Sequence, residues 1–175
     1  MSISQVVIRQ AAGDADYAAF GDLCRAYVPW CRARYADMPW FVEEVFGHQS
    51  LEAELLTLRE KYGPPKGRTL IAWRGGVALG GGATWRTLEQ TCELKRLFVT
   101  DEARGLGLGR RLTEALIDAA RADGSTMMQL DTGDRLTEAT GLYERMGFRF
   151  VDPYLPYPER LLKHLVFMER AIAPN

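Results

Sequence analysis

The alternation of hydrophobic and polar positions predicts a strand and then a long helical region in the first third of the chain. Residues 4–9 form a short β-branched run typical of a strand. Asp14 is the predicted N-cap of a helical segment that reaches Tyr62 and that Pro29 and Pro39 divide into pieces. The last piece carries an apolar stripe made of Val45, Leu51, Leu55, Leu56 and Leu58.

A Gly-Pro-Pro-Lys-Gly segment at 63–67 ends this helical region, and the pattern then changes to strands. Gly75 and Gly76 mark a hairpin turn between the first two of them. Three glycines at 80–82 weaken the second strand and indicate a bulge or a close backbone approach. The three strands, expected to form an antiparallel meander, cover residues 69–73, 77–85 and 91–99.

The strand that follows Thr91 does not alternate simply, because both of its faces would mix charged and apolar side chains. One extra residue inserted at Lys95-Arg96 would flip the parity and turn Glu93 and Phe98 to one face. The apolar residues of the other face would be Cys92, Leu94, Leu97 and Val99. A β-bulge is therefore predicted, and bulges often lie beside active sites because unpaired backbone groups can bind a ligand. An ordinary edge strand with solvated charges fits the periodicity equally well.

Residues 104–109 (RGLGLG) lead into an amphipathic helix that begins near Leu108 and ends at Gly124. Beyond this helix the pattern predicts a strand, a helix and two strands, at 127–131, 134–146, 148–151 and 164–169. The whole order predicts a mixed α/β fold in a single domain over residues 1–175.

Composition narrows the choice of function. The chain carries 22 Lys and Arg against 23 Asp and Glu, a net charge of −1, which argues against a nucleic-acid partner. No apolar run reaches the roughly 18 residues of a membrane span. The N-terminal residues do not resemble a secretory signal, so we expect a cytoplasmic protein. The three cysteines, Cys24, Cys31 and Cys92, lack metal or disulfide spacing and are expected to be buried thiols.

The glycine-rich turn carries the clearest chemical signal. Glycines at 105, 107 and 109 let main-chain N–H groups converge, and the N-terminus of the following helix adds positive partial charge. Arg104, Arg110 and Arg111 add to this charge, so the turn suits a phosphate or diphosphate. A P-loop would need Gly-Lys-Ser/Thr, and a dinucleotide fingerprint would place its third glycine at Arg110. A simple strand-to-helix turn is the alternative interpretation.

The stretch CELKRLFVTDEARGLGLG, residues 92–109, resembles the signature of the GNAT superfamily of acyl-CoA-dependent acetyltransferases. Arg104, Gly107 and Gly109 match the family's glycine pattern, and residues 142–148 match its L-Y-x-x-x-G-F pattern. The resemblance covers about residues 69–170. It implies an α/β (α+β) fold with a mixed, mostly antiparallel sheet, parallel fourth and fifth strands that splay apart, and helices on both faces.

The resemblance also implies acetyl-CoA as co-substrate and no metal. Leu97, Phe98 and Val99 would pair with the pantetheine arm as if it were an added strand. The coenzyme diphosphate would lie on the main chain of Arg104, Gly105, Leu106, Gly107, Leu108, Gly109 and Arg110. Many relatives carry Asn seven residues before the helical tyrosine, where this chain has Leu136, so one coenzyme contact would be lost.

The implied reaction is direct transfer of the acetyl group, in a ternary complex, to a primary amine of a small molecule or peptide. A backbone N–H near Leu97 could stabilise the oxyanion. Glu93 is the candidate general base, directly or through water; alternatively it is a surface carboxylate paired with a basic neighbour. Tyr143 is the candidate general acid for the coenzyme thiolate, as the family's matching tyrosine often is; alternatively it is a core aromatic.

The acceptor pocket is expected from the helical region before Tyr62 and from the loop around Tyr154 and Tyr157. That region is aromatic and acidic and would suit a small cationic amine, through Trp30, Tyr35, Asp37, Trp40, Glu43 and Glu44. Core aromatics beside a solvated charged face are the alternative. A non-catalytic acyl-CoA-binding or sensing module on the same fold is the second functional hypothesis. Many relatives are dimers, so a homodimer is also allowed.

Overall fold

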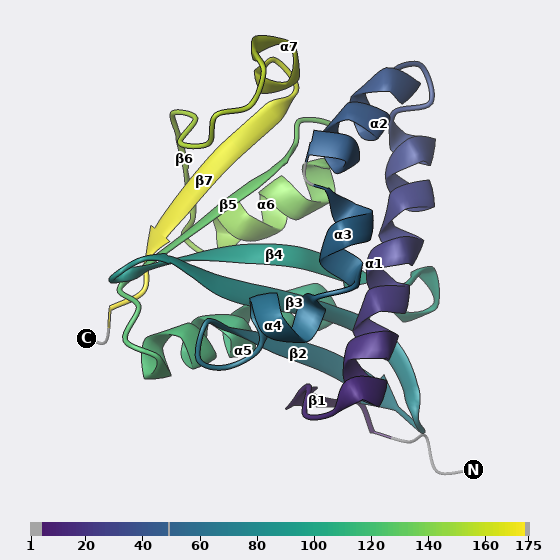
Figure 1. Ribbon diagram of the computed structural model, residues 1–175, viewed down its shortest axis with the longest axis vertical. Coiled ribbons are helices and arrows are strands. Elements are labelled where there is room, and N and C mark those ends of the chain that lie inside the picture. Colours follow the sequence, from purple (N-terminus) through teal and green to yellow (C-terminus); the bar gives the residue numbers. More distant parts are fainter. Residues whose placement is uncertain (1–4, 49, 174–175) are drawn as a thin grey trace.

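A seven-stranded sheet forms the centre of the protein, in a computed structural model that describes residues 5–48 and 50–173 (Figure 1). The strands lie in the order β1 (Val7–Gln10), β2 (Gly67–Arg74), β3 (Val77–Leu88), β4 (Thr91–Val99), β5 (Met127–Gly133), β7 (Leu165–Ala171) and β6 (Arg149–Val151). Neighbouring strands are antiparallel except β4 and β5, which are parallel. The predicted meander and mixed sheet are confirmed.

Helices cover both faces of this sheet (Figure 1). One face carries α1 (Asp14–Arg34), α2 (Pro39–His48), α3 (Leu51–Leu55) and α4 (Leu58–Tyr62), and the other carries α5 (Leu108–Ala122) and α6 (Thr137–Arg145). A 3₁₀ turn (Asp101–Ala103) and the short helix α7 (Glu159–Leu162) complete the elements. None of the helices in the described part of the chain is long and apolar enough to cross a membrane.

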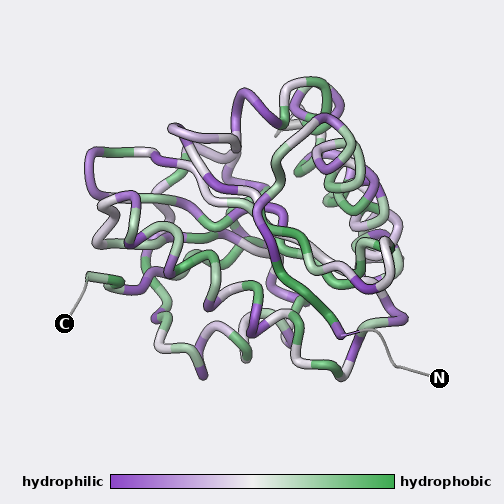
Figure 2. The backbone as a smooth tube through the Cα atoms, turned by 90° about the horizontal axis from the view of Figure 1, so that it is seen from below, coloured by the Kyte–Doolittle hydropathy of each residue, from purple (hydrophilic) through white to green (hydrophobic). Residues whose placement is uncertain are grey.

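Hydrophobic side chains fill the space between the sheet and each helix layer. Figure 2 shows hydrophobic residues along the central strands and hydrophobic and hydrophilic residues alternating along the helices. On the α5 side, Leu112, Leu116 and Met128 are completely buried. On the α1 side, Phe20 and Ile71 are completely buried. Full burial of one such side chain stabilises the fold by roughly 1.5–3 kcal/mol, so these two cores hold the sheet in place.

The helical region before Tyr62 differs from the sequence prediction at three points. Gly13 is the N-cap of α1 and Asp14 is its first helical residue, so the predicted cap is wrong by one position. Pro29 lies inside α1 and does not divide it, because packing of the buried residues on both sides maintains the helix. The apolar stripe is interrupted at Leu56, which lies between α3 and α4 and is 85% exposed, whereas Leu58 beyond it is buried as predicted.

Two further boundaries shift, and one short helix was not predicted. The predicted helix at 134–146 begins only at Thr137, because the hydroxyl of Tyr35 donates to Asp134 and accepts the amide of Arg135, both at 2.9 Å. The first strand begins at Val7, and Ser4 lies outside the described residues. Helix α7 was not predicted, because the prolines around it suggested a loop.

The predicted bulge in β4 is confirmed. Gly81 pairs with Phe98 and Ala83 pairs with Lys95, so β4 has one more residue than β3 over this interval. Arg96 takes up the extra residue with a φ of +57°. The parity flips as predicted, because Cys92, Leu94, Leu97 and Val99 face the α5 core while Phe98 joins the α1 core.

The close approach expected at the glycines of β3 is also found. A Cβ atom at Gly80 would lie 2.8 Å from the carbonyl oxygen of Phe98, and one at Gly81 would lie 3.0 Å from the ring of Phe20. Glycine therefore lets α1 and the bulged part of β4 pack directly against β3.

Candidate functional site

The parallel strands β4 and β5 separate shortly after they begin. They pair only at Thr91 with Met127, Cys92 with Met128, and Glu93 with Gln129. Beyond Glu93 the two strands diverge, and the bulge at Arg96 lies in the diverging half of β4. Two adjoining spaces lie on either side of this opening, and we refer to them as the outer groove and the inner cavity.

The outer groove has a volume of about 560 Å³ and lies between the end of β4, the start of α5, and α6. Nine of the ten residues predicted to bind the coenzyme line it, and Leu106 does not. Its lining residues are Tyr27, Trp30, Leu97, Phe98, Val99, Ala103, Arg104, Gly105, Gly107, Leu108, Gly109, Arg110, Thr132, Leu136, Glu138, Ala139, Leu142, Tyr143 and Arg145. Leu106 points outward with 47% of its surface exposed.

The glycine turn at one end of this groove presents main-chain amides. Gly105 and Gly107 have φ values of +80° and +67°, a conformation that glycine adopts without strain, and Gly107 is the N-cap of α5. The amides of residues 105 and 107–110 have no hydrogen-bond acceptor within the described chain. Together with the positive end of a 15-residue helix they form a ready anion site.

Arginines surround the same groove. The Arg104 guanidinium lies 4.8 Å from the ring centroid of Trp30 and forms a 2.7 Å ion pair with Asp101. Arg110 forms a 2.7 Å ion pair with Glu114. Arg145 also lines the groove, although the sequence analysis missed it. The sequence could have indicated Arg145 through its position two residues after Tyr143 on the motif helix. This position brings Arg145 to the groove wall.

The inner cavity is smaller, about 90 Å³, and lies under α2 where β4 and β5 diverge. It shares five lining residues with the outer groove: Tyr27, Leu97, Thr132, Leu136 and Tyr143. Its other lining residues are Cys31, Tyr35, Phe41, Val42, Val45, Phe46, Leu94, Lys95, Arg96, Leu130, Asp131, Gly133 and Leu165. The two spaces therefore meet at the wall that Leu97 and Tyr143 form.

Tyr143 lies at this junction with only 6% of its surface exposed. Burial raises the pKa of its hydroxyl, and the Asp131 carboxylate adds to the effect. The hydroxyl forms no hydrogen bond with another residue that the structure describes. The side chain is thus part of the core and also presents a protonated hydroxyl to the site, so the two interpretations of this tyrosine are compatible.

Glu93 is buried, at 2% exposure, so it is not a surface carboxylate. Its Oε2 accepts a 2.7 Å hydrogen bond from the indole of Trp85 and lies 3.5 Å from the Lys95 amine. Its Oε1 has no partner among the described atoms. The Glu93 carboxylate lies near Tyr154, and burial together with this negative charge raises the pKa of the Tyr154 hydroxyl. Glu93 lines neither the groove nor the cavity, so any contact with substrate is indirect.

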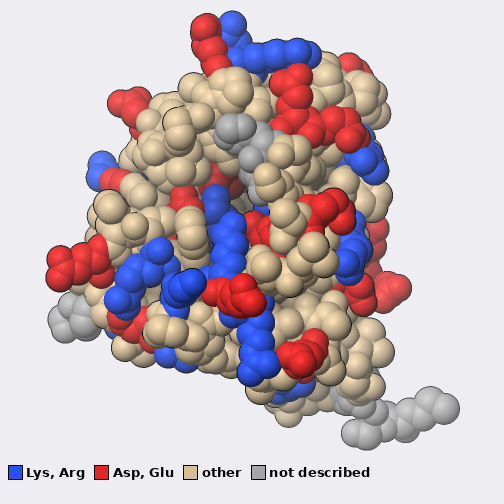
Figure 3. Space-filling view, viewed as in Figure 1, with Lys and Arg blue, Asp and Glu red and all other residues tan. Residues whose placement is uncertain are grey.

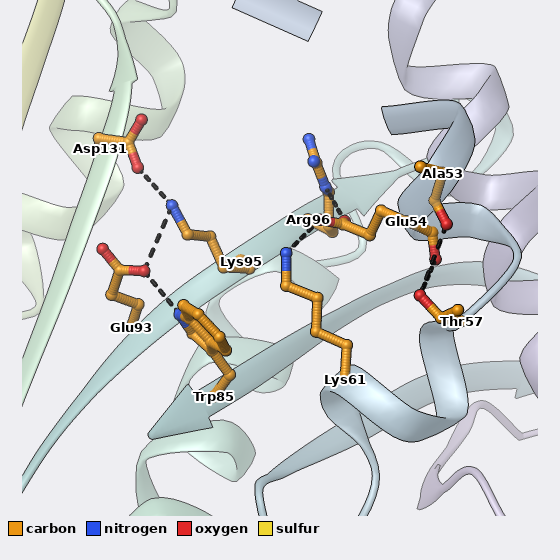
Figure 4. Close-up of polar contacts among 9 residues, drawn as sticks. All are labelled: Ala53, Glu54, Thr57, Lys61, Trp85, Glu93, Lys95, Arg96 and Asp131. Atoms are coloured by element: carbon orange, nitrogen blue, oxygen red, sulfur yellow. Dashed lines mark hydrogen bonds and ion pairs between the residues drawn. The ribbon is translucent and has the colours of Figure 1, made fainter. Parts of the chain in front are cut away.

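Lys95 and Asp131 connect the two diverging strands (Figure 4). The Lys95 amine lies 2.7 Å from Oδ1 of Asp131, whose Oδ2 accepts a 3.1 Å hydrogen bond from Tyr157. Burial alone would lower the pKa of Lys95, but Asp131 and Glu93 outweigh it and raise the pKa, so the amine stays charged. The sequence analysis missed both residues. The available signal was a carboxylate at the end of the mostly apolar strand 127–131.

A second buried charge cluster lies beside the first (Figure 4). Nε of Arg96 donates to Oε1 of Glu54 at 2.7 Å, and the Lys61 amine pairs with Oε2 of the same carboxylate. Burial would raise the pKa of Glu54, but its two cationic partners outweigh that effect and lower it. Helix α3 was predicted only as an apolar stripe, so the role of Glu54 was also missed.

The predicted acidic acceptor pocket is not found. Its acidic side chains form ion pairs with arginines of other segments: Asp37 with Arg135, Glu43 with Arg32, and Glu44 with Arg160. Trp40 lies under Arg160, and Trp30 lines the outer groove. Of the six residues predicted for the acceptor pocket, Tyr35 alone lines the inner cavity. Figure 3 shows acidic and basic atoms mixed around this face, with Lys and Arg atoms gathered in the hollow at its centre.

The three cysteines are buried and free, as expected. Cys31 lines the inner cavity, but burial raises the pKa of its thiol to about 11. At neutral pH the thiol is protonated, which disfavours a covalent acyl-cysteine step. Among the described residues no group of three or more His, Cys, Asp or Glu side chains is placed to hold a metal ion.

Comparison with known proteins agrees with this geometry. Residues 27–148 match the model of the acetyltransferase (GNAT) family. An uncharacterised N-acetyltransferase of Schizosaccharomyces pombe is 38% identical over 128 residues, which cover 69% of this chain and 73% of the relative. These matches establish the family from sequence.

Solved structures show the same fold. An acetyltransferase from Streptococcus agalactiae has a TM-score of 0.73 at 21% identity and covers 95% of this chain and 98% of its own. The PaiA N-acetyltransferase from Thermoplasma acidophilum, solved with coenzyme A, has a TM-score of 0.69 at 16% identity and covers 95% and 99%. The family match, the fold and the site together show that this chain belongs to the GNAT family of acetyl-CoA-dependent N-acetyltransferases.

Proposed function

We propose that this enzyme transfers the acetyl group of acetyl-CoA directly to a primary amine of a small molecule or peptide in a ternary complex. The supporting observation is that the outer groove and the inner cavity meet at Leu97 and Tyr143. A donor held in the groove would present its thioester at the junction, and an acceptor in the cavity would approach from the other side. Such juxtaposition can supply about 7–11 kcal/mol of the barrier reduction.

The groove fits the parts of acetyl-CoA in order. The diphosphate would bind the free amides of Gly105 and of residues 107–110, with Arg104 nearby. The pantetheine arm would lie along residues 97–99, because β4 has no parallel partner beyond Glu93. The divergence of β4 from β5 thus leaves room for the arm to pair as an added strand.

The chemistry needs two proton transfers. The amine nitrogen attacks the thioester carbonyl carbon, the C–S bond breaks, and the thiolate takes a proton from the Tyr143 hydroxyl. The amide N–H of Leu97 would stabilise the oxyanion. The proton lost by the amine would pass to Glu93 through water, since Glu93 does not line the cavity. Asp131, which does line it, is the competing proton acceptor.

A thiol-release assay with a panel of primary amines tests the proposal. We expect Tyr143→Phe and Glu93→Gln each to lower kcat by about 10²–10⁴-fold, the usual range for one acid or base. Acetyl-CoA binding, measured by calorimetry, should persist in both variants. Tyr17→Phe removes the hydroxyl of another buried tyrosine, outside both spaces, and serves as the matched control.

One outcome would contradict the proposed transfer, and another would reassign its proton acceptor. Tight acetyl-CoA binding without thiol release for any amine would favour a non-catalytic acyl-CoA-binding module. Unchanged activity in Glu93→Gln, with a large loss in Asp131→Asn, would assign the proton acceptor to Asp131.

A further inference from the structure

The inner cavity joins an apolar wall to three charged side chains. Of the described residues that line it, only Lys95, Arg96 and Asp131 carry charge, and most of the others are aliphatic or aromatic. A charged group in so apolar a site acts strongly, because the surrounding dielectric is low. The arrangement of these charges therefore constrains the chemistry of the molecule that can bind.

The charges divide into two clusters of opposite net sign (Figure 4). In one cluster Glu93 and Asp131 share a single cation, Lys95, which leaves one negative charge in excess. In the other, Arg96 and Lys61 both pair with the carboxylate of Glu54, so these three side chains together carry one excess positive charge. Asp131 of the first cluster and Arg96 of the second line the cavity. The cavity is therefore dipolar, with its negative side at β5 and its positive side at the bulge of β4.

The backbone at Arg96 has an unfavourable conformation that keeps this side chain at the cavity. Arg96 is a non-glycine residue at a φ of +57°, a conformation that costs roughly 1–2 kcal/mol. The bulge places the Arg96 side chain at the cavity wall, with only 7% of the side-chain surface exposed. Strained residues of this kind persist when the surrounding structure enforces them, and they are concentrated at functional sites.

We propose that the acceptor is a small amino acid with an apolar side chain. Its amine would face Asp131 and its carboxylate would face Arg96, since both of these residues line the cavity. This inference rests on the proposed transfer to an amine and specifies the class of that amine. The cavity volume of about 90 Å³ corresponds to about six to nine water-sized groups, which fits a small molecule. The apolar remainder of the wall would contact the side chain.

Matched substrates test the carboxylate directly. Each amino acid is compared with its carboxamide and with the amine left by removing the carboxyl group. The carboxamide is less basic than the amino acid and the decarboxylated amine is more basic, so basicity alone cannot rank the amino acid first. We expect kcat/KM for the amino acid to exceed both by about 10- to 100-fold, the effect of a charge-assisted hydrogen bond.

Variants then test Arg96. The double variant Arg96→Gln with Glu54→Gln removes a buried cation and its carboxylate together. Lys61 also loses this carboxylate, but its side chain is 32% exposed, so water can solvate its charge. We expect it to abolish the preference for the amino acid. The control is Arg68→Gln with Asp123→Asn, which removes an Arg–carboxylate pair of similar length, 2.6 Å, that is less buried and lies outside both spaces. This variant should keep the preference.

If the double variant fails to bind acetyl-CoA, Arg96→Lys replaces it. Lysine keeps the charge but lacks the forked donors of arginine, so we expect the preference to fall by about fivefold. Equal or faster acetylation of the matched amines by the wild type would overturn this inference and leave the proposed function intact. A preference that survives both Arg96 variants would also overturn it. Acetyl-CoA binding without acetylation of any compound would instead contradict the proposed function.

Discussion

At the scale of single residues, the site depends on buried charges whose partners come from other strands and helices. Lys95 is the clearest case, because its amine separates the carboxylates of Glu93 and Asp131. Without the amine, two buried anions would face each other. Removing one partner of a buried ion pair usually destabilises a protein far more than removing a surface pair does.

Lys95→Met should therefore lower the free energy of unfolding by about 3 kcal/mol at pH 7. The exposed Lys163, which pairs with Glu159 one helical turn away, provides the control, and Lys163→Met should cost less than about 0.5 kcal/mol. Urea unfolding measures both values. Equal losses in the two variants would show that Lys95 is not held in a buried network.

The pH dependence of the Lys95 effect has a definite sign. The pKa of Lys95 is raised in the folded protein, so its contribution is complete below the ordinary lysine pKa of about 10.4. It is lost as the pH rises through the raised value. The difference between wild type and Lys95→Met should thus stay constant from pH 7 to about pH 10 and narrow above that.

At the scale of elements, α5 has a left-handed glycine at each end. Gly107 precedes its first residue with a φ of +67°, and Gly124 follows its last turn with a φ of +87°. A Cβ atom would meet nothing within 4 Å at either position, so the backbone conformation alone demands glycine. Only Gly107 lies at the outer groove.

This pair separates stability from coenzyme binding. Gly107→Ala and Gly124→Ala should each destabilise the protein by about 1–2 kcal/mol, the cost of a left-handed alanine. Gly107→Ala should also weaken acetyl-CoA binding by about tenfold or more, because the main-chain amides of the glycine turn would no longer converge on the diphosphate. Calorimetry and thermal unfolding measure the two effects. A similar loss of affinity in Gly124→Ala would mean that the binding site lies elsewhere.

At the scale of the whole molecule, the outer groove joins elements from both helix layers. Trp30 of α1, Val99 of β4, Gly109 of α5 and Leu142 of α6 all line it. A ligand that fills the groove would therefore hold together segments that are far apart in the sequence. Such binding favours the folded state by mass action.

Acetyl-CoA at about 100 times its Kd should stabilise the fold by about 2.7 kcal/mol. For a chain of this size that corresponds to a rise in Tm of about 5–10 °C, measurable by calorimetry. Pantetheine, which lacks the diphosphate, should give a smaller shift at the same concentration. An unchanged Tm at millimolar acetyl-CoA would contradict the assignment of the glycine turn as the diphosphate site.

Local patterns determined most of the architecture. The broken alternation from Cys92 to Val99 predicted the bulge, because side chains alternate strictly along a strand and one inserted residue must invert them. The glycine turn before α5 likewise predicted its own backbone, since only glycine adopts those angles freely. Together with the helix pattern at 142–148 these features led to the correct family and to the residues of the outer groove.

Only the tertiary structure decided which charges meet. Asp131, which pairs with Lys95, lies 36 residues from it, and Glu54, which pairs with Arg96, lies 42 residues from it. Nothing in the local pattern of either residue encodes these long-range pairs. The same limit explains the wrong acidic pocket, because Asp37 is neutralised by Arg135 of a distant loop. Backbone conformation and the alternation of apolar positions are local properties of the chain, whereas an ion pair between distant residues depends on the whole packed molecule.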